Sequence, residues 1–188
     1  MDLVDALTRI LLANELGGRR ETAYRFSHAR RGNSGWSFGL CQWDLGNNRI
    51  ARSILYECGF DTPNIEALVR GEAPTLAMRT RLETSRAVID KWDRRNICDT
   101  VSHVRTILHL RLIRVADELT TLALCDYDNQ FYFDVNGKMA GHLAMLGRPA
   151  TAADVFRFAL GTKYGQENPD DLRRRHGNIR RIYEELTQ

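Results

Sequence analysis

The chain has 188 residues, of which 43% are hydrophobic and 27% are charged, as is ordinary for a soluble globular protein with a substantial core. No apolar run approaches the length that a membrane-spanning helix needs, and the N-terminus carries Asp2 and Asp5 where a signal peptide would carry basic residues. The net charge of +3 favours anionic partners, and the uniform composition without internal repeats predicts a single domain over residues 1–188.

The first predicted element is a helix that begins near Leu3, because apolar residues recur at helical spacing up to Leu11. Gly17 and Gly18 predict where this helix ends, which places Glu15 in its last turn. A carboxylate there faces the negative end of the helix dipole and lies beside apolar surface. Both effects favour its protonated form near neutral pH, so Glu15 is a candidate general acid.

A polar, glycine-punctuated hairpin is predicted next, with residues 34–44 (SGWSFGLCQWD) as a strand. Gln42 and Asp44 would share one face of that strand, roughly 6.8 Å apart along it. The glycines at positions 32, 35 and 39 would allow the close backbone approach that a sugar-binding wall needs. Turns alone would also explain these glycines.

The remaining chain is predicted to be helical, which gives an α+β fold that is predominantly helix. The expected helices cover residues 47–57, a short segment from Thr62, 76–95, 100–124 as the central buried helix, 138–146, a segment opened by a Thr151–Asp154 capping box, and a last helix from Asn168-Pro169.

A second cluster of acids, amides and aromatic rings follows the predicted central helix, at residues 126–132 (DYDNQFY). Such side chains suit sugar hydroxyls and ring stacking, although a polar corner with capping side chains is the simpler interpretation. Aromatic residues of the hairpin region are further candidates, with a role in the core as their alternative. The predicted substrate-binding residues are therefore Tyr24, Trp36, Phe38, Trp43, Asp128, Asn129 and Gln130.

Metal or cofactor chemistry is not predicted from the sequence. The five histidines are scattered, and the four cysteines lack any CxxC pair, which argues against zinc. Buried free thiols are the default expectation for these cysteines. The even number also permits two disulfide bonds if the protein works outside the cytoplasm. The cysteines are Cys41, Cys58, Cys98 and Cys125.

The order of a glutamate at a helix end, a glycine-rich hairpin with a glutamine, and a helical remainder resembles the lysozyme-like superfamily. This group comprises phage and bacterial muramidases such as endolysins, lytic transglycosylases, and the related chitosanases. Glu15 matches the acid of the family, and residues 34–44 are similar to its sheet strand. The chain departs from the common phage pattern, because the first strand has no aspartate and the spacing from Glu15 to the hairpin is longer.

The resemblance implies a lysozyme-like fold and a peptidoglycan-cleaving glycosidase of the N-acetylmuramidase type. Glu15 would protonate the leaving oxygen, Asp44 would activate water or shield positive charge, and Ser37 and Gln42 would hold the water or an N-acetyl group. Glu21 is the competing second carboxylate, next to Arg19 and Arg20 in what reads as a solvated turn. The alternatives within enzymes are a chitosanase-type hydrolase and a lytic transglycosylase that uses Glu15 alone.

The same resemblance implies a monomer that acts on peptidoglycan or a related amino-sugar polysaccharide without a cofactor. Without a signal peptide, the enzyme would leave the cytoplasm by phage-type release or through a dedicated secretion machine, with an immunity protein or a secretion carrier as partners. The non-enzyme alternative is a basic helical protein that binds nucleic acid or a partner, suggested by the arginines of residues 173–181. Acidic residues flank that run, and no recognition helix is identifiable, so a solvated face is expected there.

Overall fold

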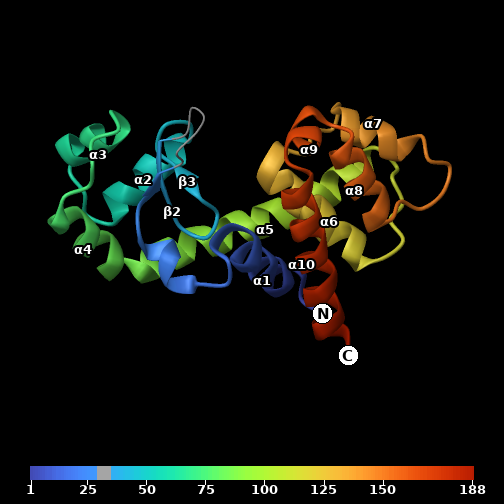
Figure 1. Ribbon diagram of the computed structural model, residues 1–188, viewed down its shortest axis with the longest axis horizontal. Helices are drawn as coiled ribbons and strands as arrows, with labels where there is room; N and C mark the ends of the chain where they lie inside the picture. The colour runs from blue at the N-terminus through green and yellow to red at the C-terminus, as the bar shows by residue number, and fades with distance from the viewer. Residues whose placement is uncertain (29–34) are drawn as a thin grey trace. The chain divides into compact units, whose positions relative to one another are not determined.

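The computed structural model describes residues 1–28 and 35–188 (Figure 1). These residues form ten α-helices, one short 3-10 helix and one three-stranded antiparallel sheet. The prediction of a predominantly helical chain with a small antiparallel sheet is therefore confirmed. No helix among these residues combines the length and the apolar character that crossing a membrane requires.

The described residues group into two compact units, one of residues 1–14 and 97–188 and one of residues 15–96. Helix α1 (Leu3–Leu16) and helix α5 (Arg86–Leu110) each contribute residues to both units. The single domain expected over residues 1–188 stays a prediction, because two compact units that share helices can belong to one folding domain.

The unit of residues 15–96 contains the sheet and three short helices. Its strands pair in the order β1-β2-β3, and α2 packs against both β3 and α3 (Figure 1). The elements are η1 (Arg20–Tyr24), β1 (Ser27–His28), β2 (Trp36–Phe38), β3 (Trp43–Asp44), α2 (Arg49–Glu57), α3 (Thr62–Val69), α4 (Leu76–Thr84) and the first part of α5.

One face of the sheet is apolar and forms the core of this unit. Phe38 is fully buried and lies opposite Trp43, which is 4% exposed. The ring of Phe26 meets those of Trp36, Phe38 and Phe60 edge-on, with centroids 6.5, 6.0 and 6.0 Å apart. Such edge-to-face contacts add to the stabilisation from burial alone. The other face of the sheet is thereby left to polar side chains.

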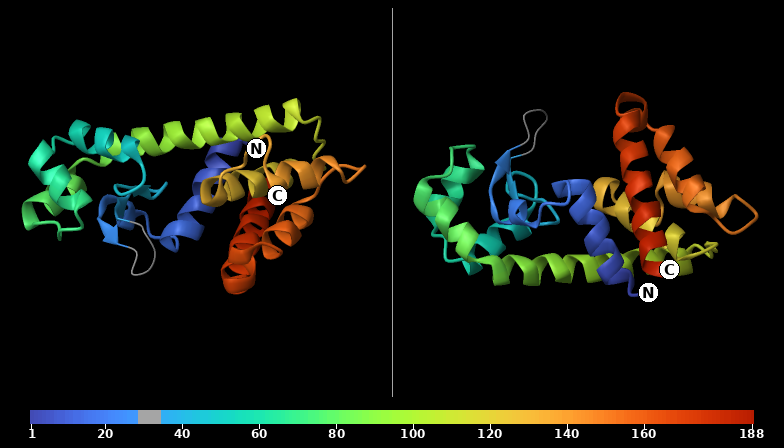
Figure 2. Two further views of the ribbon diagram at one scale, coloured as in Figure 1. Left: turned by 90° about the horizontal axis from the view of Figure 1, so that it is seen from above. Right: turned by 60° about the horizontal axis from the view of Figure 1, so that its bottom comes forward.

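The unit of residues 1–14 and 97–188 is entirely helical in its described elements. Helix α6 is its centre, because residues 120–126 are buried and the helix packs against both α8 and α10 (Figure 2). The elements that join α1 and α5 here are α6 (Glu118–Phe131), α7 (Lys138–Ala144), α8 (Ala152–Leu160), α9 (Lys163–Glu167) and α10 (Pro169–Thr187).

A buried polar cluster ties three helices of this unit together. Arg175 of α10 donates two hydrogen bonds to Asp126 of α6, at 3.0 Å from Nε and 2.7 Å from a terminal nitrogen. The side chain of Asn14 donates to the same carboxylate at 2.9 Å and accepts from Asn178 at 2.9 Å. Because every partner is satisfied, the buried charges of the Asp126–Arg175 pair are tolerated.

Two predicted helices are wrong in their extent. The central helix expected over residues 100–124 is interrupted, because α5 ends at Leu110 and α6 begins at Glu118. Leu112 adopts a left-handed φ of 51°, and the Asp117 side chain caps the new helix by accepting from Thr120 N at 2.8 Å. The helix expected over residues 76–95 is likewise two helices, α4 and α5.

Candidate functional site

Glu15 lies in the last turn of α1, as predicted, and its side chain is half-buried. The helix ends where Gly17 and Gly18 take left-handed φ values of 57° and 80°. Burial and then the charge on Asp93 raise the pKa of the Cys41 thiol, and Glu15 adds to the same effect. The carboxylate of Glu15 therefore lies within electrostatic range of the turn that joins β2 to β3.

The polar face of the sheet brings three of the four predicted catalytic residues together. In the strand register Ser37 lies opposite both Ser27 and Asp44, so these side chains share one face. The Gln42 side chain reaches the same face, because its Oε1 accepts from Ser27 Oγ at 3.3 Å. Ser37, Gln42 and Asp44 therefore form one polar cluster with Ser27, which the sequence prediction did not include.

The prediction that residues 34–44 form one strand is wrong, because the chain reverses between β2 and β3. Gly39 and Gln42 lie in the turn with φ values of 77° and 52°, and Gln42 Nε2 donates to the Gly39 carbonyl at 3.0 Å. Gln42 and Asp44 are thus not alternate residues of one strand. The Gln42 side chain nevertheless reaches the polar face, where it accepts a hydrogen bond from Ser27. Gly32 and Ser34 of the predicted hairpin lie outside the described residues.

Asp93 of α5 holds this turn in place from the apolar side. Its buried carboxylate accepts from Leu40 N at 2.8 Å, from Cys41 N at 3.2 Å and from Trp43 Nε1 at 2.9 Å. Burial raises the pKa of Asp93, and the three donors act in the opposite direction. A β-carbon on Gly39 would lie 2.5 Å from Trp43 Cδ1, so the close approach needs glycine. Sequence reasoning missed Asp93, because no local pattern distinguishes it from other charged residues of α5.

Asp44 has a structural role as well as its predicted catalytic one. Its Oδ1 accepts from Gly35 N at 2.9 Å and Gly46 N at 2.8 Å, and its Oδ2 accepts from Asn47 Nδ2 at 2.7 Å. These bonds join the start of β2 to the loop after β3. Three N–H donors also suit a carboxylate that carries its negative charge, as the second catalytic group must. Glu21, the competing candidate, pairs with Arg86 at 2.7 Å.

Three of the four aromatic residues predicted to bind substrate are buried. Phe38 and Trp43 belong to the apolar face of the sheet, and Tyr24 is 5% exposed with its hydroxyl 2.9 Å from Asp90 Oδ1. Their rings have no exposed face on which a sugar could stack, so we revise that assignment to a packing role. Trp36 keeps a partly exposed ring while its Nε1 donates to the Glu72 carbonyl at 2.8 Å.

The remaining predicted substrate-binding residues lie on α6, in the other unit, and within the helix instead of after it. Asp128 Oδ1 accepts from Phe133 N at 2.7 Å and lies 3.6 Å from His103 Nε2, while burial raises the pKa of the carboxyl group. This geometry fits the alternative of a capped polar corner. Asn129 is half-buried, and Gln130 lines a cavity of about 30 Å³ beside the Asp126–Arg175 pair.

Over the described residues, no three His, Cys, Asp or Glu side chains are placed to hold a metal ion together. All four cysteines are free thiols, of which Cys58 and Cys125 are buried. Comparison of the chain with protein-family models, with curated proteins and with solved structures finds no match.

Proposed function

We propose that this chain is a glycoside hydrolase of the lysozyme-like class that cleaves peptidoglycan, with Glu15 as the general acid. The observation that carries the proposal is the polar sheet face, where Ser37, Gln42 and Asp44 gather, with Glu15 within electrostatic range of the adjoining turn. The order of elements supports it: an acid at the end of the first helix, then a small antiparallel sheet, then helices.

The chemistry of the glycosidic bond explains why these groups would be needed. Cleavage requires a proton for the leaving oxygen and negative charge near an oxocarbenium-like transition state. Glu15 would supply the proton, and Asp44 would provide the charge or activate a water molecule. The amide of Gln42 is fixed by Gly39 O and Ser27 Oγ, so it can orient that water without losing much side-chain entropy.

Two related reactions fit the same acid. A lytic transglycosylase would need Glu15 alone, with a hydroxyl of the sugar replacing water, and a chitosanase would use the same pair of carboxylates on a glucosamine polymer. Mass spectrometry of the released fragments separates these reactions, because hydrolysis leaves reducing ends and transglycosylation leaves anhydro-muramic ends. The Asp44→Asn variant gives a second separation when its unfolding midpoint equals that of the unmodified chain, since only hydrolysis needs the charge of that carboxylate.

The nucleic-acid alternative is weakened by the ion pairs along α10. Every arginine of this helix lies within 4.0 Å of a carboxylate oxygen, and the Asp126–Arg175 pair is buried. The expectation of a solvated face is therefore wrong for Arg175. The pairs are Arg173–Asp170, Arg174–Asp171, Arg175–Asp126, Arg180–Glu184 and Arg181–Glu185. Carboxylates that neutralise these arginines reduce the attraction of the helix for phosphates.

The test is lysis of purified peptidoglycan by the Glu15→Gln variant, measured by zymography and by release of reducing ends. General acid catalysis contributes about 10²–10⁴-fold to a rate, so we expect a loss of at least about 10²-fold with an unchanged unfolding midpoint. The matched control is Glu66→Gln, which changes an exposed glutamate of α3 in the same unit and should leave lysis intact. Full lytic activity of Glu15→Gln would overturn the proposal.

A further inference from the structure

The end of α5 and the loop that follows it form an exposed basic and apolar surface, which we call the basic tip. Residues 100–116 contain three arginines and two histidines but neither aspartate nor glutamate. The basic tip is composed of Arg105, His109, Leu110, Arg111, Leu112 and Arg114. All of its residues belong to one compact unit, and the proposed glycosidase chemistry uses none of them.

Two leucines of the basic tip are turned toward solvent. Leu112 is 87% exposed and Leu110 is 63% exposed, so two large aliphatic side chains two positions apart face solvent in the same segment. The backbone of Leu112 has a left-handed φ of 51°, a conformation that leucine disfavours. Strain of this kind together with exposure commonly accompanies a functional constraint on the side chain.

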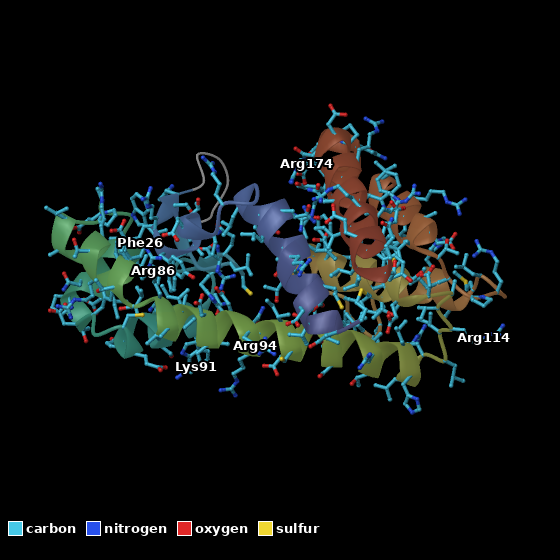
Figure 3. The ribbon with its side chains drawn as sticks, turned by 90° about the horizontal axis from the view of Figure 1, so that it is seen from below. Phe26, Arg86, Lys91, Arg94, Arg114 and Arg174 are labelled. Atoms are coloured by element: carbon cyan, nitrogen blue, oxygen red, sulfur yellow. The ribbon has the colours of Figure 1, made fainter. Side chains whose placement is uncertain are left out.

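The arginines of the basic tip differ from those of α10. No hydrogen bond, ion pair or ring contact is formed by the side chains of Arg105, Arg111 or Arg114 within the described part of the chain. Arg114 projects from the ribbon at the edge of its unit (Figure 3). The nearest following carboxylate in the sequence, Asp117, is occupied with Thr120, whose N and Oγ1 donate to it at 2.8 and 2.6 Å.

The loop is held in this exposed form by backbone hydrogen bonds. Ala150 N donates to Arg114 O at 2.8 Å, and Ala116 N donates to Ala150 O at 2.8 Å, so the segment is joined to the residues before α8. Beside it lies an open hollow of about 560 Å³, with Leu108, Ile113 and Val115 on its walls and Arg105 and Arg114 also lining it. The geometry is therefore preorganised to receive a ligand that combines anionic and apolar groups.

We infer that the basic tip docks on the surface of an anionic phospholipid membrane. Protruding leucines enter the boundary between headgroups and acyl chains, and the unpaired guanidinium groups bind the lipid phosphates. Charge complementarity favours this occupant, because the three arginines and the exposed leucines lie in a segment, residues 100–116, that contains no acidic residue. A protein partner would need an apolar pocket shaped for the two projecting leucines with acidic residues around it. A lipid surface accepts the leucines without a complementary shape.

The inference is tested by co-sedimentation of the full chain with vesicles of phosphatidylcholine, with and without phosphatidylglycerol. We expect binding only to the vesicles that contain phosphatidylglycerol, and weaker binding as salt is added. Each basic residue near an anionic surface strengthens the partition about fivefold, so Arg111→Gln with Arg114→Gln should weaken it roughly 25-fold. Leu112→Asn removes the apolar side chain, suits the left-handed backbone, and should weaken binding about tenfold or more.

The matched control is Arg180→Gln with Arg181→Gln, which removes the same charge from ion-paired arginines of α10 and should leave vesicle binding nearly unchanged. Absence of vesicle binding would overturn the inference, as would equal binding to both kinds of vesicle or an equal loss in the control. The basic-tip variants should cleave soluble peptidoglycan fragments at the rate of the unmodified chain. A failure of membrane binding is therefore distinguishable from a failure of the proposed glycosidase activity.

Discussion

Replacement of Asp93 by asparagine tests whether a buried carboxylate organises the sheet that carries the candidate site. The side chain keeps its size but loses its charge and one acceptor oxygen. In the native protein Oδ1 accepts from Cys41 N and Trp43 Nε1, and Oδ2 accepts from Leu40 N. Asparagine can supply only one of these oxygens, so an amide NH₂ must face at least one buried N–H donor.

The expected loss follows from these three hydrogen bonds. One unsatisfied buried donor costs about 1–3 kcal/mol, and the two remaining bonds each lose about 1 kcal/mol when the acceptor becomes neutral. Relief from burying a charge offsets part of this sum, because burial raises the pKa of Asp93 in the native protein. We therefore expect Asp93→Asn to lower the free energy of unfolding by about 2–4 kcal/mol.

Urea unfolding measures this loss, which should shift the midpoint by roughly 1–2 M at an ordinary m value. Because the pKa of Asp93 is higher in the native protein than in the unfolded chain, protonation of this carboxyl group stabilises the fold. This stabilisation is full at a pH below the unfolded-state pKa and is lost as the pH rises through the native pKa. The Asp93→Asn variant should lack this pH dependence. The control is Asp61→Asn, at an exposed N-cap of α3 where asparagine is equally favourable. Equal stability of Asp93→Asn and the unmodified chain would refute the reasoning.

Two further changes probe the packing of each unit. Gly39→Ala should lower the free energy of unfolding by about 2–5 kcal/mol, because the new methyl group clashes with buried atoms and the φ of 77° disfavours alanine. The control is Gly71→Ala, where φ is 84° but the space around the residue is open, and its loss in thermal unfolding should be only about 1–2 kcal/mol. Burial, and then the charge on Arg180, lowers the pKa of His176 in the native protein. The free energy of unfolding should therefore fall as the pH drops from about 6.5, the ordinary pKa of histidine, to the lower pKa of His176 in the native protein. Urea midpoints of His176→Gln should lack that decline and those of His109→Gln, at an exposed position, should keep it.

The sequence predicts a helix end correctly where a glycine or a capping side chain at that position sets it. The end of α1 at Gly17 and the Thr151–Asp154 capping box of α8 were both recognised from short-range patterns and are confirmed. The break between α5 and α6 was not predictable, because Leu112, Ile113 and Val115 continue the apolar spacing of a helix. Packing of the loop against Ala150 overrides that local preference.

The sequence alone determined the residue types of the candidate site: an acid at a helix end, followed by a polar hairpin with Gln42 and Asp44. The tertiary structure alone decided which of them meet, because Asp93 acts on the hairpin from about fifty positions along the chain. It likewise buried Trp43, which the sequence left between a sugar-binding and a core role, and it paired Arg175 with Asp126 inside an expected solvated face. Periodicity reports which face a residue occupies on its own element, whereas burial depends on what the rest of the chain brings against that face.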